Sequence, residues 1–490
     1  MQIASKELSA VEMVKTALEK AKAAQEKYSV FISLNKEAAL KRAAEIDGKI
    51  KNGENPGRLA GVPYALKDNF LSKDGNTTAA SKILEPMKSP ITATSVKKLE
   101  DEGAIMIGRT NLDAFAHGSS TENSYFGPTK NSKDAARVAG GSSGGSAVAV
   151  ALDIVQFATG TDTGGSIRQP ASFNGVYGFK PTYGTISRYG VVAMASSTDC
   201  VGFFANSAED IDLLMSITAG QDPYDMTTLP DYYGADFTRG DALRGPAGPE
   251  PQASGSDGRY NATAPWDAEG RRPTGPRKIG VIKDFDIKGD IKDALDKKIK
   301  DLKSKGYEIV ELEMPTLKYA LAVYYIVVPA EISSNLSRYD GIRYAYRNSS
   351  AKSLDEVYGK SRSDGFMPEN KRRIMIGNFV LSSGFYDAYY LKAQKARTLI
   401  IKEYEEAFKK CDFILSPVTP NPAFKLGEKT DDPVSMYLED VMSVPINLAG
   451  LPSLAFPVGE TKDGLSLGLQ LIGPRRSDKA LLDFAGKELK

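Results

Sequence analysis

The chain has 490 residues, of which 41% are hydrophobic and 26% are charged, a composition typical of a globular protein with one large domain or several smaller ones. Its net charge of +1 gives no sign of a long phosphate-binding surface. The two cysteines, Cys200 and Cys411, exclude a disulfide framework, and the single histidine, His117, excludes a histidine-rich metal site. No apolar run reaches the ~18 residues of a membrane helix, and the charged N-terminus is unlike a signal peptide, so we expect a cytoplasmic protein without membrane contact.

The first predicted elements alternate between charged helices and short apolar strands. Ser9, followed three residues later by Glu12, forms a capping box that predicts a helix to about residue 26. The next elements are predicted as a helix over 35–52, a strand over 61–66, a helix over 92–102 and a strand over 104–108.

The second half of the chain continues this alternation. Its predicted elements are a strand, helix and strand within 278–315, mostly helix over 370–411, and two strands within 453–473. Alternating helices and short strands predict an α/β fold.

Residues 240–277 differ in composition from both flanks. They are rich in Gly, Pro, Ala and Arg, lack lysine and contain the chain's single tryptophan, Trp266. This composition predicts a disordered or loosely packed insertion, and we expect no function from it. A frameshifted stretch of coding sequence would have the same composition.

Two loops rich in glycine and serine are the strongest candidates for a catalytic site. Residues 140–146 read GGSSGGS, which fits the G-x-S-x-G nucleophile elbow around Ser142. That interpretation fails because α/β-hydrolases place the histidine after the serine, whereas His117 precedes it. The second loop, residues 161–170, reads TDTGGSIRQP and contains Ser166.

Together with GVPYALKDN at residues 61–69, these loops resemble the amidase-signature family. The intervals between Lys67, Ser142 and Ser166 match the family's usual spacing. The resemblance implies a Ser-cisSer-Lys triad in which Lys67 is the base, Ser142 the bridging serine after a cis peptide bond, and Ser166 the nucleophile. It also implies a single domain over residues 1–490, with a large, mixed, twisted β-sheet covered on both faces by helices.

The chemistry of these residue types agrees with the implied triad. A serine hydroxyl is a poor nucleophile unless a base lies within hydrogen-bond reach. Lysine accepts a proton only when it is neutral, so burial must lower the pKa of Lys67 from ~10.4. The apolar residues before Lys67 favour such burial. Ser142 can both accept and donate a proton, so it can relay one from Ser166 to Lys67.

The loop around Ser166 also offers backbone donors for the oxyanion of a tetrahedral intermediate. Donors with little side-chain crowding are the N–H groups of Thr163, Gly164, Gly165 and Ser166. Residues expected either to hold the two loops in place or to make ordinary loop hydrogen bonds are Ser143, Asp162 and Arg168.

Longer segments are similar to the A subunits of glutamyl-tRNA(Gln)/aspartyl-tRNA(Asn) amidotransferases, namely residues 111–127, 172–199, 371–400, 416–424 and 432–459. The resemblance implies a glutaminase that supplies ammonia to a tRNA-binding B subunit in a complex with a small C subunit. It implies that tRNA is contacted mainly through the partner. No cofactor or metal is expected on this chain, and ATP and Mg²⁺ are expected on the partner subunit.

By position, Arg373 resembles the family residue that holds the α-carboxylate of glutamine, and Asp440 the residue that holds the α-amine. The adjacent Arg372 remains an alternative to Arg373. His117 stands where the family usually has methionine, and we expect it to line or support the pocket. Two other hypotheses remain: a stand-alone amidase acting on other amides or carbamates, and a non-catalytic scaffold, which an intact triad disfavours.

Overall fold

The computed structural model describes residues 9–230, 233, 278–283, 285 and 287–489. The predicted insertion at 240–277, with Trp266, lies outside these residues. Within the described part, the strands form one eleven-stranded sheet in the order β1-β3-β2-β4-β6-β5-β10-β11-β9-β7-β8. The α/β prediction is therefore confirmed. A sheet that joins strands from both ends of the chain supports the single-domain interpretation, which stays a prediction.

The sheet is mixed. Parallel pairs join β3 to β2, β2 to β4, β9 to β7 and β7 to β8, whereas the remaining neighbours are antiparallel. The strands are β1 (Phe31–Leu34), β2 (Pro63–Lys67), β3 (Ile105–Thr110), β4 (Phe157–Asp162), β5 (Tyr177–Lys180), β6 (Cys200–Ala205), β7 (Lys278–Ile282), β8 (Glu308–Leu312), β9 (Phe413–Pro417), β10 (Ser453–Glu460) and β11 (Ser466–Ile472).

Helices cover both faces of the sheet because strand side chains alternate between two apolar cores. Tyr64 and Leu66 point into one core, whereas Ala65 between them points into the other. The first core is covered by α3 (Thr94–Asp101), α6 (Ala208–Thr218), α8 (Gly289–Ser304) and α15 (Asp478–Glu488). The opposite face carries α1 (Ala10–Tyr28), α2 (Lys36–Lys51), α4 (Gly144–Ala151), α5 (Arg168–Asn174), α12 (Lys392–Lys410) and α14 (Val444–Ala449).

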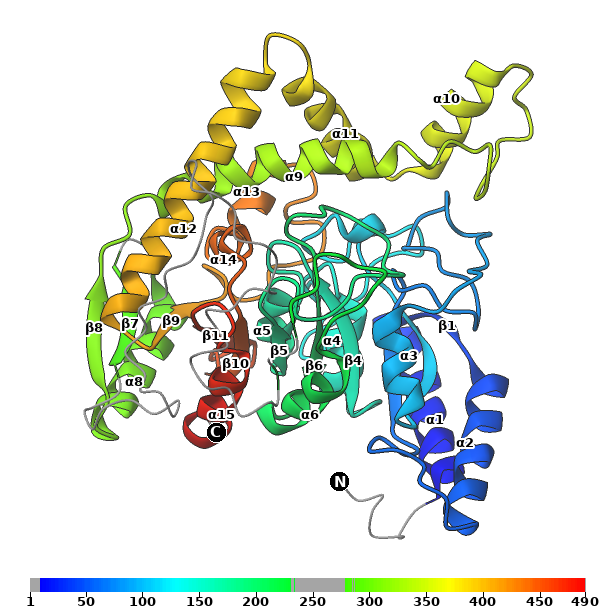
Figure 1. Cartoon of the computed structure of the whole chain (residues 1–490), viewed down its shortest axis with the longest axis horizontal. Coiled ribbons are helices and arrows are strands. Elements are labelled where there is room, and N and C mark those ends of the chain that lie inside the picture. The colour runs from blue at the N-terminus through cyan, green and yellow to red at the C-terminus, as the bar shows by residue number, and fades with distance from the viewer. Residues whose placement is uncertain (1–8, 231–232, 234–277, 284, 286, 490) are drawn as a thin grey trace, which may run out of the picture.

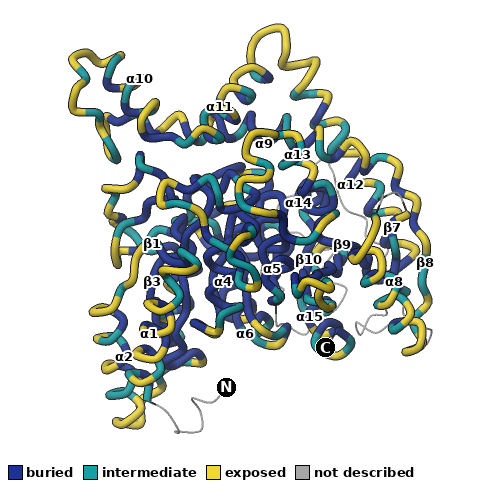
Figure 2. The backbone as a smooth tube through the Cα atoms, turned by 180° about the vertical axis from the view of Figure 1, so that it is seen from behind, coloured by how far each residue is buried: buried dark blue, intermediate teal, exposed yellow. Residues whose placement is uncertain are grey.

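A group of helices lies across one end of the sheet (Figure 1). It consists of α9 (Ala320–Leu336), α10 (Leu354–Gly365), α11 (Pro368–Leu381), the π-helix η4 (Tyr386–Leu391) and α13 (Pro433–Leu438), with the short η2 (Ala114–Ala116) and η3 (Leu317–Tyr319). The pair α9 and α11 packs so closely that a Cβ on Gly377 would lie 2.0 Å from the carbonyl oxygen of Pro329. Figure 2 shows that α10 and the turn between α11 and α12 are far more exposed than the strands beneath them.

The helix and strand predictions agree with the structure where the sequence patterns are strongest. Glu12 N–H donates to Ser9 Oγ at 3.1 Å, and Ser9 N–H donates to Glu12 Oε2 at 3.0 Å, so the capping box is confirmed. The sequence assigned no element to α9, whose residues are apolar on most sides and therefore lack the one-sided pattern of a surface helix. No helix in the described residues is long and apolar enough to cross a bilayer.

Candidate active site

Lys67 ends strand β2, next to the end of the parallel strand β4. The side chain is fully buried, and its Nζ lies 2.8 Å from Ser142 Oγ and 2.8 Å from Thr161 Oγ1. Burial lowers the pKa of Lys67 to about 7, although the nearby carboxylates of Asp113 and Asp162 oppose the shift. A lysine with this pKa is partly neutral near pH 7, so it can act as a base.

Ser142 lies in the glycine-rich loop before α4 and is fully buried. The Gly141–Ser142 peptide bond is cis, as the resemblance implies. Gly141 has no room for a side chain, since a Cβ there would lie 2.2 Å from Asp113 Oδ2. The Asp113 carboxylate also accepts the N–H groups of Thr121 at 2.9 Å and Asn123 at 3.1 Å, which holds the neighbouring loop against Ser142.

Ser166 lies between β4 and α5 and is 8% exposed. Its carbonyl accepts the N–H of Ser143 at 3.2 Å, so the two glycine-rich loops are tied together. The Lys67–Ser142 hydrogen bond is formed, but no hydrogen bond joins Ser142 to Ser166 among the described residues. The structure thus shows the Lys67–Ser142 link of the expected relay, and the Ser166 hydroxyl, the expected nucleophile, has no hydrogen bond to Ser142.

Asp162 and Arg168 form a buried ion pair that shapes the loop carrying Ser166. The Arg168 guanidinium donates to both carboxylate oxygens of Asp162, at 3.0 and 3.1 Å, and both side chains are fully buried. Burial alone would raise the pKa of Asp162, but the charge and hydrogen bonds of Arg168 overcome this and lower it. Asp162 Oδ1 also accepts the N–H of Gly165 at 2.8 Å.

That last contact changes the expected oxyanion hole. The N–H of Gly165 is already used by Asp162, so in this structure Gly165 is not a free donor. Among the described residues, no side-chain or loop backbone acceptor is hydrogen-bonded to the N–H groups of Thr163, Gly164 and Ser166. These three N–H groups therefore remain the candidates for binding an oxyanion.

The glycines of this loop are also required by their neighbours. A Cβ on Gly164 would lie 2.4 Å from the hydroxyl oxygen of Tyr324, and one on Gly165 would lie 2.4 Å from Ser443 Oγ. Gly165 has φ of +136°, which other residues rarely adopt. Residues of α9 and of the segment before α14 therefore press directly on the loop that carries the candidate nucleophile.

Arg373 is placed in the site by α11, whereas its neighbour Arg372 is not. The side chain of Arg373 is 2% exposed and that of Arg372 is 42% exposed, because successive residues of a helix point in different directions. Arg373 Nε donates to Glu369 Oε1 at 2.7 Å and its Nη2 donates to the carbonyl of Gly118 at 2.9 Å. Its guanidinium also lies 5.3 Å from the ring centroid of Tyr325.

Arg373 and Asp440 both contact Tyr325, and together they form one wall of the candidate site, called the candidate substrate wall below. Tyr325 donates its hydroxyl to Asp440 Oδ2 at 2.9 Å. Burial raises the pKa of Asp440 to about 7, whereas the Tyr325 hydrogen bond and the Arg373 charge oppose the rise. Ser443 Oγ donates to the carbonyl of Gly164 and lies 3.1 Å from that of Asp440, so this wall is continuous with the loop of Ser166.

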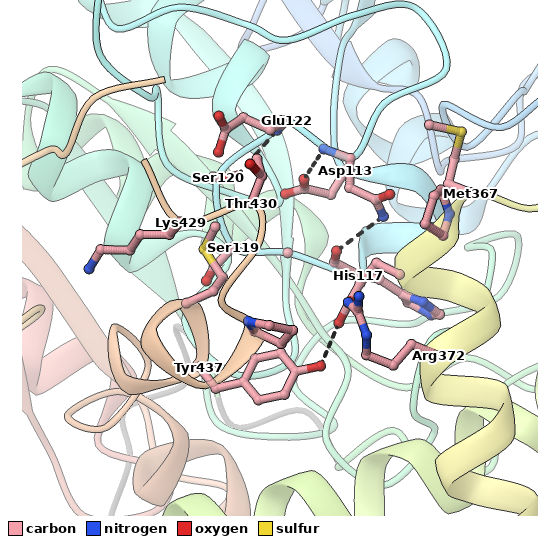
Figure 3. A pocket seen from close by; sticks show the side chains of 16 residues that line it. Asp113, His117, Ser119, Ser120, Glu122, Met367, Arg372, Lys429, Thr430 and Tyr437 are labelled. Carbon is pink, nitrogen blue, oxygen red and sulfur yellow. Dashed lines mark hydrogen bonds and ion pairs between the residues drawn. The ribbon is translucent and has the colours of Figure 1, made fainter. Parts of the chain in front are cut away.

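His117 is buried next to the Arg373 side of the candidate substrate wall, and no hydrogen bond among the described residues joins it to Ser142 or Ser166. Its Nδ1 lies 2.8 Å from Asn370 Nδ2 on α11. Burial, reinforced by the positive charge of Arg373, lowers the pKa of His117 well below its usual value. The histidine therefore forms no serine-histidine pair in this structure, and it is one of the residues that line a neighbouring cavity (Figure 3).

Sequence reasoning assigned no role to several residues that the fold brings to the site. These are Asp113, Thr161, Asp199, Tyr324, Tyr325, Ser443 and Asn447. Asp199, for example, accepts the hydroxyl of Thr163 at 2.6 Å. No cluster of His, Cys, Asp or Glu that could hold a metal ion occurs in the part of the chain that is described.

The chain is similar to known amidases in sequence. The amidase family profile matches residues 12–482. The chain is 48% identical to the A subunit of the glutamyl-tRNA(Gln) amidotransferase of Carboxydothermus hydrogenoformans over 488 residues, which cover 99% of this chain and 94% of that protein. It is 46% identical to the corresponding protein of Picosynechococcus over 487 residues, which cover 99% of this chain and 95% of that protein.

Solved structures show the same similarity. The A subunit of the glutamyl-tRNA(Gln) amidotransferase from Thermotoga maritima is 34% identical, with a TM-score of 0.72 over 97% of this chain and 93% of that chain. The native peptide amidase from Stenotrophomonas maltophilia is 26% identical, with a TM-score of 0.76 over 99% of this chain and 94% of that chain.

Proposed function

Because the chain belongs to the amidase family and is closely related to glutamyl-tRNA(Gln) amidotransferase A subunits, we propose that it is a glutaminase that releases ammonia from glutamine. The observation that carries this proposal is that Arg373 and Asp440, both buried, contact the same side chain, Tyr325, on one wall beside the Ser166 loop. A guanidinium and a carboxylate side by side match the α-carboxylate and α-ammonium of a free amino acid. A hydrolase of simple amides needs neither group.

The proposed reaction follows from the positions of three side chains. Ser166 Oγ attacks the side-chain carbonyl carbon of glutamine while Ser142 takes the Ser166 proton and passes its own to neutral Lys67. The backbone donors of Thr163, Gly164 and Ser166 stabilise the oxyanion. The proton then moves to the amide nitrogen, the C–N bond breaks and ammonia leaves a glutamyl ester on Ser166. Water hydrolyses that ester to release glutamate and restore the serine.

We further propose that the ammonia is used by a larger complex, as the names of the related proteins suggest. In that complex a tRNA-binding B subunit, with ATP and Mg²⁺, activates Glu-tRNA(Gln) or Asp-tRNA(Asn) for amidation, and a small C subunit is the third chain. tRNA would be contacted mainly through the B subunit. We place the complex in the cytoplasm, where buried thiols such as Cys200 and Cys411 stay reduced.

The test is ammonia release from glutamine, asparagine and an aryl amide, measured for the purified chain and for the chain co-purified with B and C subunits. We expect a preference for glutamine that is lost in Arg373→Met, because the variant cannot pair with the α-carboxylate. The matched control is Arg372→Met, whose side chain is exposed and should keep the preference.

A stand-alone amidase is the second candidate, and the similarity in fold to a peptide amidase favours it. It predicts the opposite result in the same assay. Preferred hydrolysis of the aryl amide, unchanged in Arg373→Met, would replace the glutaminase proposal and leave only the triad in place.

A further inference from the structure

Strand β4 presents two buried threonines, Thr159 and Thr161, to the end of strand β2 that carries Lys67. Side chains two positions apart on a strand point to the same side of the sheet. The backbone pairing of β2 with β4 stops at Ala65 and Ala158, so beyond that point side chains connect the two strands. Thr159 Oγ1 accepts the backbone N–H of Lys67 at 3.0 Å, whereas Thr161 contacts the lysine side chain.

Thr161 contacts the amine of Lys67 with both of its oxygens. Its hydroxyl oxygen Oγ1 lies 2.8 Å from Lys67 Nζ, and its carbonyl oxygen lies 3.4 Å from the same nitrogen. Ser142 Oγ, at 2.8 Å, is a third oxygen around Nζ. A protonated lysine has three N–H donors and no acceptor, so these three oxygens match the ammonium form of Lys67.

Neighbouring side chains hold both oxygens of Thr161 in place. Asn69 Nδ2 donates to Thr161 Oγ1 at 3.1 Å, and Ser143 Oγ donates to the Thr161 carbonyl at 3.3 Å. A hydroxyl oxygen has two lone pairs, so Oγ1 can accept from Asn69 and from Lys67 at the same time. Because Asn69 and Ser143 are buried, this arrangement exists before any substrate binds.

The contact with Thr161 favours one protonation state of Lys67. A hydrogen bond from a charged donor is roughly twice as strong as one between neutral groups. Thr161 therefore stabilises the ammonium more than the neutral amine, whereas burial favours the neutral amine. Nearby carboxylates act in the same direction as Thr161, and those that face the amine belong to Asp113, Asp162 and Asp199.

We propose that Thr161 is a positioning residue, which holds Lys67 Nζ against Ser142 and stabilises the ammonium that forms when Ser142 passes its proton to the lysine. The inference rests on the proposed glutaminase function, in which Lys67 is the base. In this step the Ser142 O–H bond breaks and Nζ gains the proton, while Ser142 takes the proton of Ser166 as the Ser166 oxygen bonds to the amide carbon. The lysine later returns its proton through Ser142 to the departing nitrogen.

The test compares Thr161→Val, which replaces the hydroxyl by a methyl group, with Thr161→Ser, which keeps the hydroxyl. The kcat and KM for glutamine are measured from about pH 5.5 to about pH 9 with the full chain in its complex. We expect Thr161→Val to lower the kcat plateau by roughly 10- to 100-fold, the loss typical of a hydrogen bond to a charged group, with little change in KM.

The pH dependence gives a readout that a merely structural role would not move. Thr161→Val removes an acceptor from the ammonium, so the pKa of Lys67 should fall and neutral lysine should be present at lower pH. The rise of kcat with pH should therefore move down by about one pH unit. Thr161→Ser should restore both the plateau and the position of the rise.

Thr159→Val is the matched control, because Thr159 lies on the same strand and accepts the backbone N–H of Lys67 instead of its amine. It should lower the stability of the fold and leave the position of the rise unchanged. If Thr161→Val does not fold because it leaves Asn69 Nδ2 unpaired, the double variant Asn69→Leu/Thr161→Val removes both partners of that bond and takes its place.

Asp113 has to be separated from Lys67 in this assay, because burial raises its pKa to about 7 as well. Its carboxylate, labelled in Figure 3, accepts backbone N–H groups and has no hydrogen bond to Thr161 among the described residues. Thr161→Val should therefore leave in place a rise that belongs to Asp113, and a shifted rise is assigned to Lys67.

An unchanged kcat in Thr161→Val, a lower kcat without a shift, or a shift to higher pH would overturn the inference and leave the glutaminase intact. The same conclusion would follow if Thr161→Ser did not restore the rise. Failure of the unmodified complex to hydrolyse glutamine at all would instead overturn the proposed function, and the inference with it.

Discussion

The candidate catalytic centre and the candidate substrate wall are built in different ways. Around the catalytic centre, Lys67, Asp162 and Arg168 are fully buried and each is engaged by neighbouring side chains. On the substrate wall, His117 has a nitrogen without a partner among the described residues, and Asp440 is a buried carboxylate whose pKa burial raises to about 7. Lys67, Asp162 and Arg168 thus have their partners without a ligand, whereas Asp440 is a buried carboxylate with which the α-ammonium of an amino acid would pair.

This difference predicts which kinetic constant a substitution in each region should change. Residues of the catalytic centre should affect kcat or the stability of the fold, because their contacts exist before substrate binds. Residues of the wall should affect KM, because in the proposed function they bind the substrate equally in the ground state and in the transition state. The variants below test this division, from the largest expected effect to the smallest.

Ser166→Ala should lower kcat by about 10⁶-fold, because the variant has no group to form the acyl-enzyme. Ammonia release measured with a coupled glutamate assay checks the loss, and thermal melting checks that the fold is intact. Ser95→Ala is the control and should keep full activity. Substantial turnover in Ser166→Ala would mean that another residue is the nucleophile.

Lys67→Ala should lower kcat by about 10²- to 10⁴-fold, the usual contribution of a general base. In the unmodified enzyme kcat should rise with pH through about 7, because burial lowers the pKa of Lys67 to that value and only neutral lysine accepts a proton. The rise should be absent from the residual activity of the variant. A pH profile at saturating glutamine separates this effect from ionisation of Asp440, which acts on binding. The same rise in Lys67→Ala would assign it to another group.

Arg168→Met should lower the free energy of unfolding by about 3–5 kcal/mol, because it leaves the buried carboxylate of Asp162 without its partner. Urea unfolding measures the change. Lys292→Met breaks an exposed pair with Asp296 and should change stability by less than about 1 kcal/mol. Equal stability of the two variants would show that the catalytic centre is less dependent on this ion pair than its burial indicates.

Tyr325→Phe should raise the KM for glutamine by about 2- to 10-fold with little change in kcat, because Asp440 loses one hydrogen bond. That hydrogen bond lowers the pKa of Asp440, so its loss should raise the pKa above about 7. Asp440 then needs a higher pH to ionise and hold the α-ammonium. The KM of the variant should therefore improve between pH 7 and 8 more than that of the unmodified enzyme.

Tyr183→Phe is the control, since it removes a hydroxyl that donates to the carbonyl of Ser196 away from the site. A fall in kcat with an unchanged KM in Tyr325→Phe would place Tyr325 in the catalytic centre and remove the division between the two regions.

Much of the catalytic centre could be predicted because its residues come in short contiguous segments. The loops around Ser142 and Ser166 carry their own glycines, and Lys67 ends a strand whose apolar pattern is visible in the sequence. The sequence explains only in part why glycine occupies positions 164 and 165. Sequence reasoning gave Gly164 and Gly165 to the oxyanion, whereas the fold also requires them because Tyr324 and Ser443 press on the loop.

The sequence by itself determined the α/β class, the strand that ends at Lys67 and the positions of both serine loops, since each depends on local pattern and spacing. Only the tertiary structure decided which arginine is buried at the candidate site, because Arg372 and Arg373 are adjacent in sequence and their side chains leave the helix in different directions. It also decided the pKa of Lys67 and the contact of His117 with Asn370. Both depend on burial and on partners far away in the chain, which local sequence does not contain.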